Sequence, residues 1–173
     1  MRIYLFIILF FLIFSNPSRA FADSDYVLPY PSAMPGSIFY KLNLIQEEIL
    51  KFWHFGDFGQ FKYNLQQSDK YLVEAKTLFD YKQYLLAYQA LQKSDNYFKK
   101  IESVILSAKK NGKNTIDKEK LLKEAAEKHI EELAKLKQNL PPTFEWRPEK
   151  QQPRILNLKE AFEISIKIRQ EGL

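Results

Sequence analysis

Apolar residues recur every three or four positions through most of the chain, a spacing typical of helices that bury one face. Four such stripes lie between residues 38 and 140. They are Ile38, Leu42, Ile45, Ile49, Phe52 and Trp53; then Phe61, Leu65, Ser68, Leu72, Ala75 and Phe79; then Tyr84, Tyr88, Leu91, Phe98, Ile101, Ile105 and Ala108; and then Leu122, Ala125, His129, Leu133, Leu136 and Leu140. The stripes predict helices over about 38–55, 58–79, 81–110 and 117–139.

The joints between these helices contain capping residues. Ser37, Asp57 and Asp80 stand where the first three helices begin, and their side-chain oxygens can accept backbone N–H groups of a first turn. Thr115 or Asp117 starts the fourth helix, after a Lys-Lys-Asn-Gly stop signal at residues 109–112. Joins this short favour antiparallel neighbours, so the predicted fold class is all-α, an antiparallel bundle of four long helices.

The N-terminus has the pattern of a secretory signal peptide. Arg2 precedes an apolar run from Ile3 to Phe14, and a polar break is followed by Ala20-Phe21-Ala22. Small residues at Ala20 and Ala22 suit a signal peptidase, which predicts cleavage after residue 22. An uncleaved anchor is the competing interpretation, but twelve apolar residues rise only about 18 Å as a helix, against a hydrocarbon core of about 30 Å.

Prolines concentrate at the two ends of the remaining chain. Residues 23–36 therefore predict an extended lead, followed by the bundle at 37–140 and an extended connector at 141–156. Asn157 and Glu160 form an N-terminal capping pattern for a last helix within residues 157–173. We expect that helix to dock on its own bundle, with Phe144 and Trp146 as anchors; docking on another molecule is the alternative.

Composition excludes several classes of protein. The 173 residues contain no cysteine, so disulfides, thiol chemistry and Cys-based metal sites are ruled out. Apolar residues make up 46% and charged residues 27%, which is typical of a globular domain. The net charge of +5 falls to +3 once Arg2 and Arg19 are removed with the signal peptide, too little to indicate a nucleic-acid partner.

Candidate catalytic chemistry is sparse. The two histidines, His54 and His129, lack the Glu-x-x-His spacing of di-iron bundles, because Ala126 stands three residues before His129. We expect His129 to be a histidine at the edge of the core satisfied by one hydrogen bond, and His54 to be a cation at a helix C-terminus. We therefore predict no catalytic residue, no metal and no cofactor, although carboxylates from different helices can still meet.

Tyrosines are abundant on the second and third predicted helices. They are Tyr63, Tyr71, Tyr81, Tyr84, Tyr88 and Tyr97. Such residues can form the rim of a core with hydrated hydroxyl groups, or a groove for glycan or peptide; we expect the rim.

Several motifs together resemble the domain-of-unknown-function family DUF5667 of exported bacterial proteins. They are Leu28-Pro29-Tyr30-Pro31, Pro35, Tyr40, the stretch Asp69-Lys70-Tyr71-Leu72-Val73-Glu74-Ala75, and Lys128-His129. Ser32 stands where the family favours Gly, and Tyr71 where it favours Arg. The resemblance implies an exported helical module and transfers no catalytic residue.

These observations favour a non-enzymatic exported helical bundle that acts in the cell envelope or outside the cell, by binding a macromolecule or as structural support. The expected partner is a protein or an envelope polymer, not nucleic acid, and the membrane is contacted only through the signal segment before cleavage. The alternative is an envelope enzyme with a carboxylate site between helices.

Overall fold

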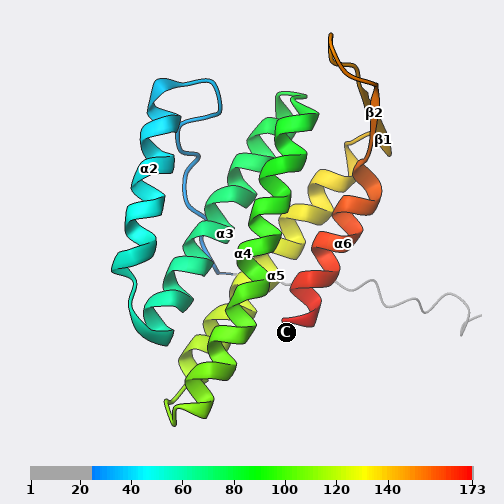
Figure 1. Ribbon diagram of the computed structural model, residues 1–173. Coiled ribbons are helices and arrows are strands. Elements are labelled where there is room, and N and C mark those ends of the chain that lie inside the picture. The colour runs from blue at the N-terminus through cyan, green and yellow to red at the C-terminus, as the bar shows by residue number, and fades with distance from the viewer. Residues whose placement is uncertain (1–24, 173) are drawn as a thin grey trace, which may run out of the picture.

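The computed structural model describes residues 25–172 and shows a helical bundle with a small β-hairpin (Figure 1). The elements are α2 (Ile38–Trp53), α3 (Gly56–Asp80), α4 (Tyr84–Lys110), α5 (Ile116–Gln138), β1 (Thr143–Trp146), β2 (Arg154–Asn157) and α6 (Leu158–Glu171). The all-α bundle predicted from the sequence is confirmed, with helix bounds within three residues of those predicted. Ala20, Ala22 and the rest of the predicted signal peptide lie outside the described residues.

The helix starts agree only partly with the predicted caps. Ser37 caps α2 by accepting a hydrogen bond from the Phe39 N–H at 3.2 Å, and Asn157 caps α6 by accepting from the Glu160 N–H at 3.3 Å. The predicted caps at Asp57 and Asp80 are wrong, because Asp57 already lies inside the first turn of α3 and Asp80 is the last residue of that helix. The α2–α3 turn is instead set by Gly59, where a Cβ would stand 2.9 Å from the backbone carbon of His54.

Helices α3, α4, α5 and α6 form the body of the bundle. Helices α3 and α4 pack antiparallel along their length, and α6 lies against α5 and α4. The core consists of two apolar clusters. One is built around Leu72, Leu78, Leu91, Leu133 and Phe162, and the other around Phe61, Leu65, Phe98, Ile101 and Ala125.

The connector after α5 contains an antiparallel hairpin that the sequence did not predict. Thr143 pairs with Asn157 and Trp146 with Arg154. The ring of Phe144 packs against Tyr84 with 4.8 Å between centroids, as expected for an anchor. The hairpin turns the chain back at once, and α6 docks mainly on α5 and α4. Its Phe162 also packs against Phe79 of α3, with 5.1 Å between the ring centroids.

The lead is only partly attached to the bundle. Leu28 and Met34 pack against the first core cluster, and the Tyr26 hydroxyl donates to Asp69. Tyr30, in contrast, is 96% exposed and does not pack on the bundle. The lead is therefore attached through Tyr26, Leu28 and Met34 and not through Tyr30.

Helix α2 stands at one edge of the molecule, beside α3 and across from α6 (Figure 1). Its apolar stripe, expected to join the bundle core, points away from it. Ile38, Leu42, Ile45, Ile49 and Phe52 are between 53% and 72% exposed. The side of α2 that faces α3 is the polar one, where Tyr40 is half-buried and Glu47 is buried.

Candidate functional site

A layer of polar side chains crosses the bundle between its two apolar clusters. Each of four helices contributes to this buried polar layer, which consists of Ser68 and Asp69 on α3, Ser94 and Asp95 on α4, His129 on α5, and Ser165 and Arg169 on α6. In every helix these residues interrupt an apolar stripe. A buried polar group is costly unless it is hydrogen-bonded, so the internal partners of this layer decide what it can do.

Asp69 is the acceptor at one end of the layer. Its Oδ1 lies 2.7 Å from Nε2 of His129, and its Oδ2 accepts a hydrogen bond from the Tyr26 hydroxyl at 2.5 Å. Helix α3, helix α5 and the lead are therefore joined at one carboxylate.

Arg169 forms the other end, where it pairs with Asp95. Its Nη1 donates to Oδ1 of Asp95 and to the Ser165 carbonyl, and its Nη2 donates to the Ser94 hydroxyl at 2.8 Å. The Ser165 hydroxyl donates to Oδ2 of Asp95 at 2.6 Å. The guanidinium also lies 5.1 Å from the centroid of the Phe98 ring. The cation is thus matched by a carboxylate, hydroxyls and an aromatic face.

Asp69 and Arg169 contact the two ring nitrogens of His129, and together they determine where the imidazole carries its proton. Nε of Arg169 lies 3.4 Å from Nδ1 of His129, and a guanidinium can only donate. Nδ1 therefore accepts, and the single proton of a neutral ring lies on Nε2, facing Asp69. Burial lowers the pKa of His129, outweighing the hydrogen bond to Asp69 that raises it. Burial also lowers the pKa of Arg169. The pKa of Tyr26 is raised, mainly by burial and to a smaller extent by the negative charge of Asp69.

The layer has the parts of an acid–base site but not its accessibility. His129 and Arg169 are both 0% exposed, so a substrate has no path to them in this conformation. The described residues contain no group of three or more His, Asp or Glu side chains able to hold a metal ion. The arrangement holds four helices and the lead in one register.

A second polar cluster lies between α2 and α3. Glu47 is buried, pairs with Lys70, and accepts from the Tyr71 hydroxyl at 2.7 Å. The Tyr40 hydroxyl donates to Glu74 at 3.1 Å. Burial and then the charge of Glu74 raise the pKa of Tyr40 to about 12. Burial also raises the pKa of Glu74 and lowers that of Lys70. Helix α2 is therefore docked through polar and charged groups.

Opposite this cluster, α2 exposes its apolar side. Ile38, Leu42, Ile45, Ile49 and Phe52 form what we call the outer stripe of α2. Phe39 and Trp53 flank it, and Phe55 extends it past the end of the helix; all three are exposed. Monomeric proteins rarely leave a contiguous apolar surface of this kind uncovered, and large exposed apolar patches usually mark interaction sites. Within residues 25–172 no helix is both long and apolar enough to cross a membrane.

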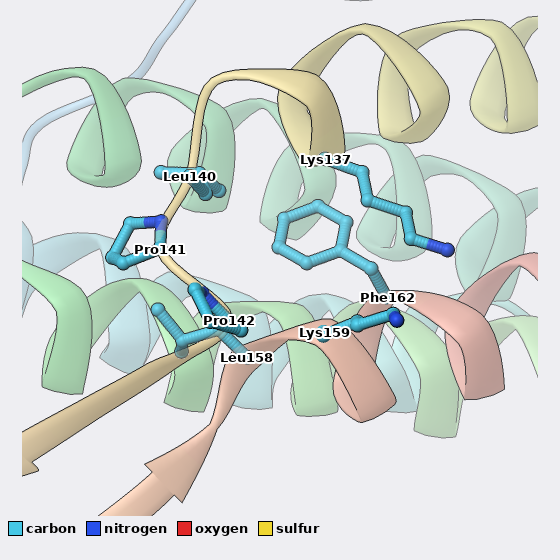
Figure 2. A pocket seen from close by; sticks show the side chains of 7 residues that line it. All are labelled: Lys137, Leu140, Pro141, Pro142, Leu158, Lys159 and Phe162. Carbon is cyan, nitrogen blue, oxygen red and sulfur yellow. The ribbon is translucent and has the colours of Figure 1, made fainter.

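Two of the hollows on the surface are lined by described residues. The smaller, about 160 Å³, lies where α5 ends and α6 begins; Figure 2 shows Leu140, Pro141 and Pro142 on one side and Phe162 with Lys137 on the other. The larger, about 400 Å³, is lined mainly by Phe58, Phe61, Leu65 and Leu121, with Lys62 and Lys118 among its walls. The described residues that line these two hollows include lysines but no carboxylate and no histidine.

The structure brings together several residues of the family-like motifs. Asp69 contacts His129, and Tyr40 contacts Glu74, although each pair is far apart in the sequence. Lys70 pairs with Glu47, and Leu72 and Ala75 lie in the core. Leu28 packs on the core, Pro35 is half-buried, and Pro29, Tyr30 and Pro31 are exposed.

Other sequence predictions have mixed outcomes. His129 is hydrogen-bonded, as expected, but lies at the centre of the core and not at its edge. His54 is the C-terminal cap of α2, with Nδ1 2.8 Å from the Leu50 carbonyl oxygen. Tyr63, Tyr71 and Tyr97 pack against one another on the side of α3 and α4, where Tyr63 and Tyr71 are buried. The sequence reasoning missed Asp95 and Arg169.

Comparison with known proteins identifies the family. The model for a domain of unknown function, DUF5667, matches residues 32–143, which is more than half of the chain. The chain belongs to the DUF5667 family. The matched region contains Asp69, Asp95 and His129, whereas Arg169 and the rest of α6 follow it. No curated protein and no solved structure matches the chain.

Proposed function

We propose that this DUF5667 protein is a non-enzymatic interaction module that works in the cell envelope or outside the cell. The observation that supports binding is the orientation of α2. Its polar side packs against α3, and its outer stripe is exposed. Burying one large apolar side chain is worth about 1.5–3 kcal/mol, so five exposed together are a strong driving force for association. Export rests on the sequence of residues 1–22.

Capture with a matched pair of substitutions tests this proposal. Ile49 lies in the outer stripe, whereas Ile155 is equally apolar and is exposed on β2. We expect Ile49→Asp to remove the contacts that the protein makes in its own cell envelope, measured by crosslinking and mass spectrometry, and Ile155→Asp to leave them intact. Equal crosslinking by both variants would reject the outer stripe as the binding surface.

Export is tested separately by the intact mass of the protein isolated from its cells. Removal of residues 1–22 leaves a chain that starts at Asp23. A full-length product retained in the membrane would contradict cleavage, though not binding by the outer stripe.

An enzyme remains the second candidate because of one observation, the contact of 2.7 Å between Asp69 and His129. A carboxylate that orients an imidazole is common in acid–base sites. Chemical labelling distinguishes the two functions, since His54 and His129 are the chain's histidines. Diethyl pyrocarbonate should modify half-buried His54 and spare His129 in the native protein. Rapid modification of His129 would show that the buried polar layer opens and would favour the enzyme.

A further inference from the structure

We propose that the outer stripe of α2 is covered by the same stripe of a second copy of the chain, with the two α2 helices antiparallel. This inference rests on the proposed function, because it names the partner of the same surface. Three features of α2 support it: the spacing of the stripe, the position of the residues that attach α2 to the bundle, and the charges beside the stripe.

The outer stripe has the spacing of a coiled-coil seam. Its members, Ile38, Leu42, Ile45, Ile49 and Phe52, are separated by four, three, four and three residues. This alternation is the a and d pattern of a heptad repeat, in which two helices pack knobs into holes. A helix that lies in a bulk apolar surface usually shows a broader stripe. The narrow seam therefore indicates another helix as the occupant.

The attachment of α2 leaves that seam facing outward. Tyr40, Glu47 and His54 are also seven residues apart, and in the same heptad they occupy the position opposite the seam. Tyr40 donates to Glu74, Glu47 pairs with Lys70, and the His54 ring lies 5.4 Å from that of Tyr63. Helix α2 is thus attached to α3 through the side opposite the seam, and the seam faces outward in a fixed orientation.

The charges beside the seam favour a second copy in the antiparallel direction. Lys41 and Glu48 are exposed, seven residues apart, and lie on the same flank of the stripe in the heptad. Such flanking positions form the salt bridges that set partner and orientation in coiled coils. In an antiparallel pair, Lys41 of each copy faces Glu48 of the other, giving two equivalent ion pairs related by a two-fold axis. In a parallel pair Lys41 would face Gln46, and Glu48 would face Trp53.

The alternative occupant is a lipid surface, and the charges favour it less. An interfacial helix usually has a polar face rich in Lys and Arg. Helix α2 instead contains two lysines, Lys41 and Lys51, and two glutamates, Glu47 and Glu48. Exposed aromatic residues such as Phe39 and Trp53 suit either occupant, but in a helix pair they flank the seam and shield it from water.

Sedimentation equilibrium of the purified protein over a range of micromolar concentrations tests the proposal. We expect twice the monomer mass. Ile45→Asp, at the centre of the seam, should raise the dimer dissociation constant by about 100-fold or more, while Ile155→Asp leaves it unchanged. Because Ile45 is 59% exposed, the variant should keep its fold, which circular dichroism checks.

Charge reversal tests the direction of the helices without altering the seam. Lys41→Glu or Glu48→Lys alone places like charges opposite one another and should weaken the dimer about tenfold. The double variant restores opposite charges and should recover the affinity to within about threefold. Lys51→Glu, on the same helix but away from the seam, is the matched control.

Three results would overturn the inference. They are a monomer at every concentration, a dimer insensitive to Ile45→Asp, and failure of the double variant to recover affinity. Sedimentation with vesicles of phosphatidylglycerol and phosphatidylethanolamine, lost in Ile45→Asp, would assign the outer stripe to a membrane. In that case the proposed interaction function would stand and only the identity of the partner would be wrong.

Discussion

Nε2 of His129 lies 2.7 Å from Oδ1 of Asp69, and this contact joins two helices across the centre of the bundle. Arg169 donates to the other ring nitrogen, so a second proton on the imidazole would meet a donor and not an acceptor. The native state therefore holds His129 in its neutral form. Because the unfolded chain can protonate this histidine more readily, the stability of the protein depends on pH.

The first prediction concerns that pH dependence. Burial lowers the pKa of His129 below its usual value of about 6.5, which the unfolded chain retains. Below about pH 6.5 the unfolded state thus binds a proton that the native state does not. The free energy of unfolding should fall by up to about 1.4 kcal/mol per pH unit in that range. Urea denaturation between pH 7 and pH 5 measures this slope.

His129→Gln should flatten the slope and keep the fold. A glutamine amide can donate to Asp69 and accept from Arg169, but it does not titrate. Loss of the ring contact with Phe98 should cost about 1 kcal/mol at pH 7. His54→Gln is the control and should leave the slope in place. An unchanged slope in His129→Gln would mean that other groups cause it.

The second prediction concerns the buried ion pair. Arg169→Met removes the cation and leaves Asp95 charged in the core, which should cost about 3–5 kcal/mol in the free energy of unfolding. Arg147→Met removes an ion pair with Glu145 in which both side chains are exposed, and should cost less than about 1 kcal/mol. Guanidinium denaturation compares the two, and similar losses would contradict a structural role for Arg169.

The third prediction concerns the two tyrosines of the lead. Tyr26→Phe removes a hydrogen bond to Asp69 and should lower stability by about 1–2 kcal/mol. Tyr30→Phe alters a residue that is almost fully exposed and should change stability by less than about 0.5 kcal/mol. Equal thermal stabilities of the two variants would show that the lead is not attached at Tyr26.

The fourth prediction concerns the docking of α6. Residues 149–153 between the two strands and Arg154 at the start of β2 are exposed, so trypsin should cut first at Lys150 or Arg154. The released segment should stay with the bundle, because Phe162, Ile168 and Arg169 are buried in it. Denaturing gels would show two fragments, whereas size-exclusion chromatography would show one particle. Separation of the fragments under native conditions would contradict the docking.

Periodicity predicted the helices because local spacing determines which side of a helix is apolar. It could not determine what each side meets. Ile45 and Leu65 belong to similar stripes, yet one is exposed and the other buried. The deciding contact is Glu47 with Lys70 and Tyr71, which involves partners more than twenty residues away.

The buried polar layer left a signal that could have been used. Ser68 and His129 occupy apolar positions of their stripes. In the third stripe Phe98 follows Leu91 by seven positions, and Ser94 and Asp95 lie between them. When several apolar stripes are interrupted by polar residues at the same level along the bundle, those polar residues are expected to contact one another in the core. The pairing of Arg169 with Asp95 could not be predicted from the sequence pattern. It depends on the hairpin, which determines where α6 packs on the bundle.

The hairpin was missed for a related reason. Arg154 to Asn157 is too short a segment to stand out by alternation, and its partner strand follows two prolines. A strand of four residues is stable only with its partner and with the packing of Phe144 and Leu156 beneath it.

Arg169 also imposes an order on folding. It follows every other member of the buried polar layer in the sequence, so Asp95 cannot pair with this cation until α6 is available. A chain that emerges from a ribosome or a translocation channel starting at its N-terminus can form helices α2 to α5 early. It cannot close the charged centre of the bundle until α6 arrives. The last helix therefore supplies the cation that completes the packing of helices α3, α4 and α5.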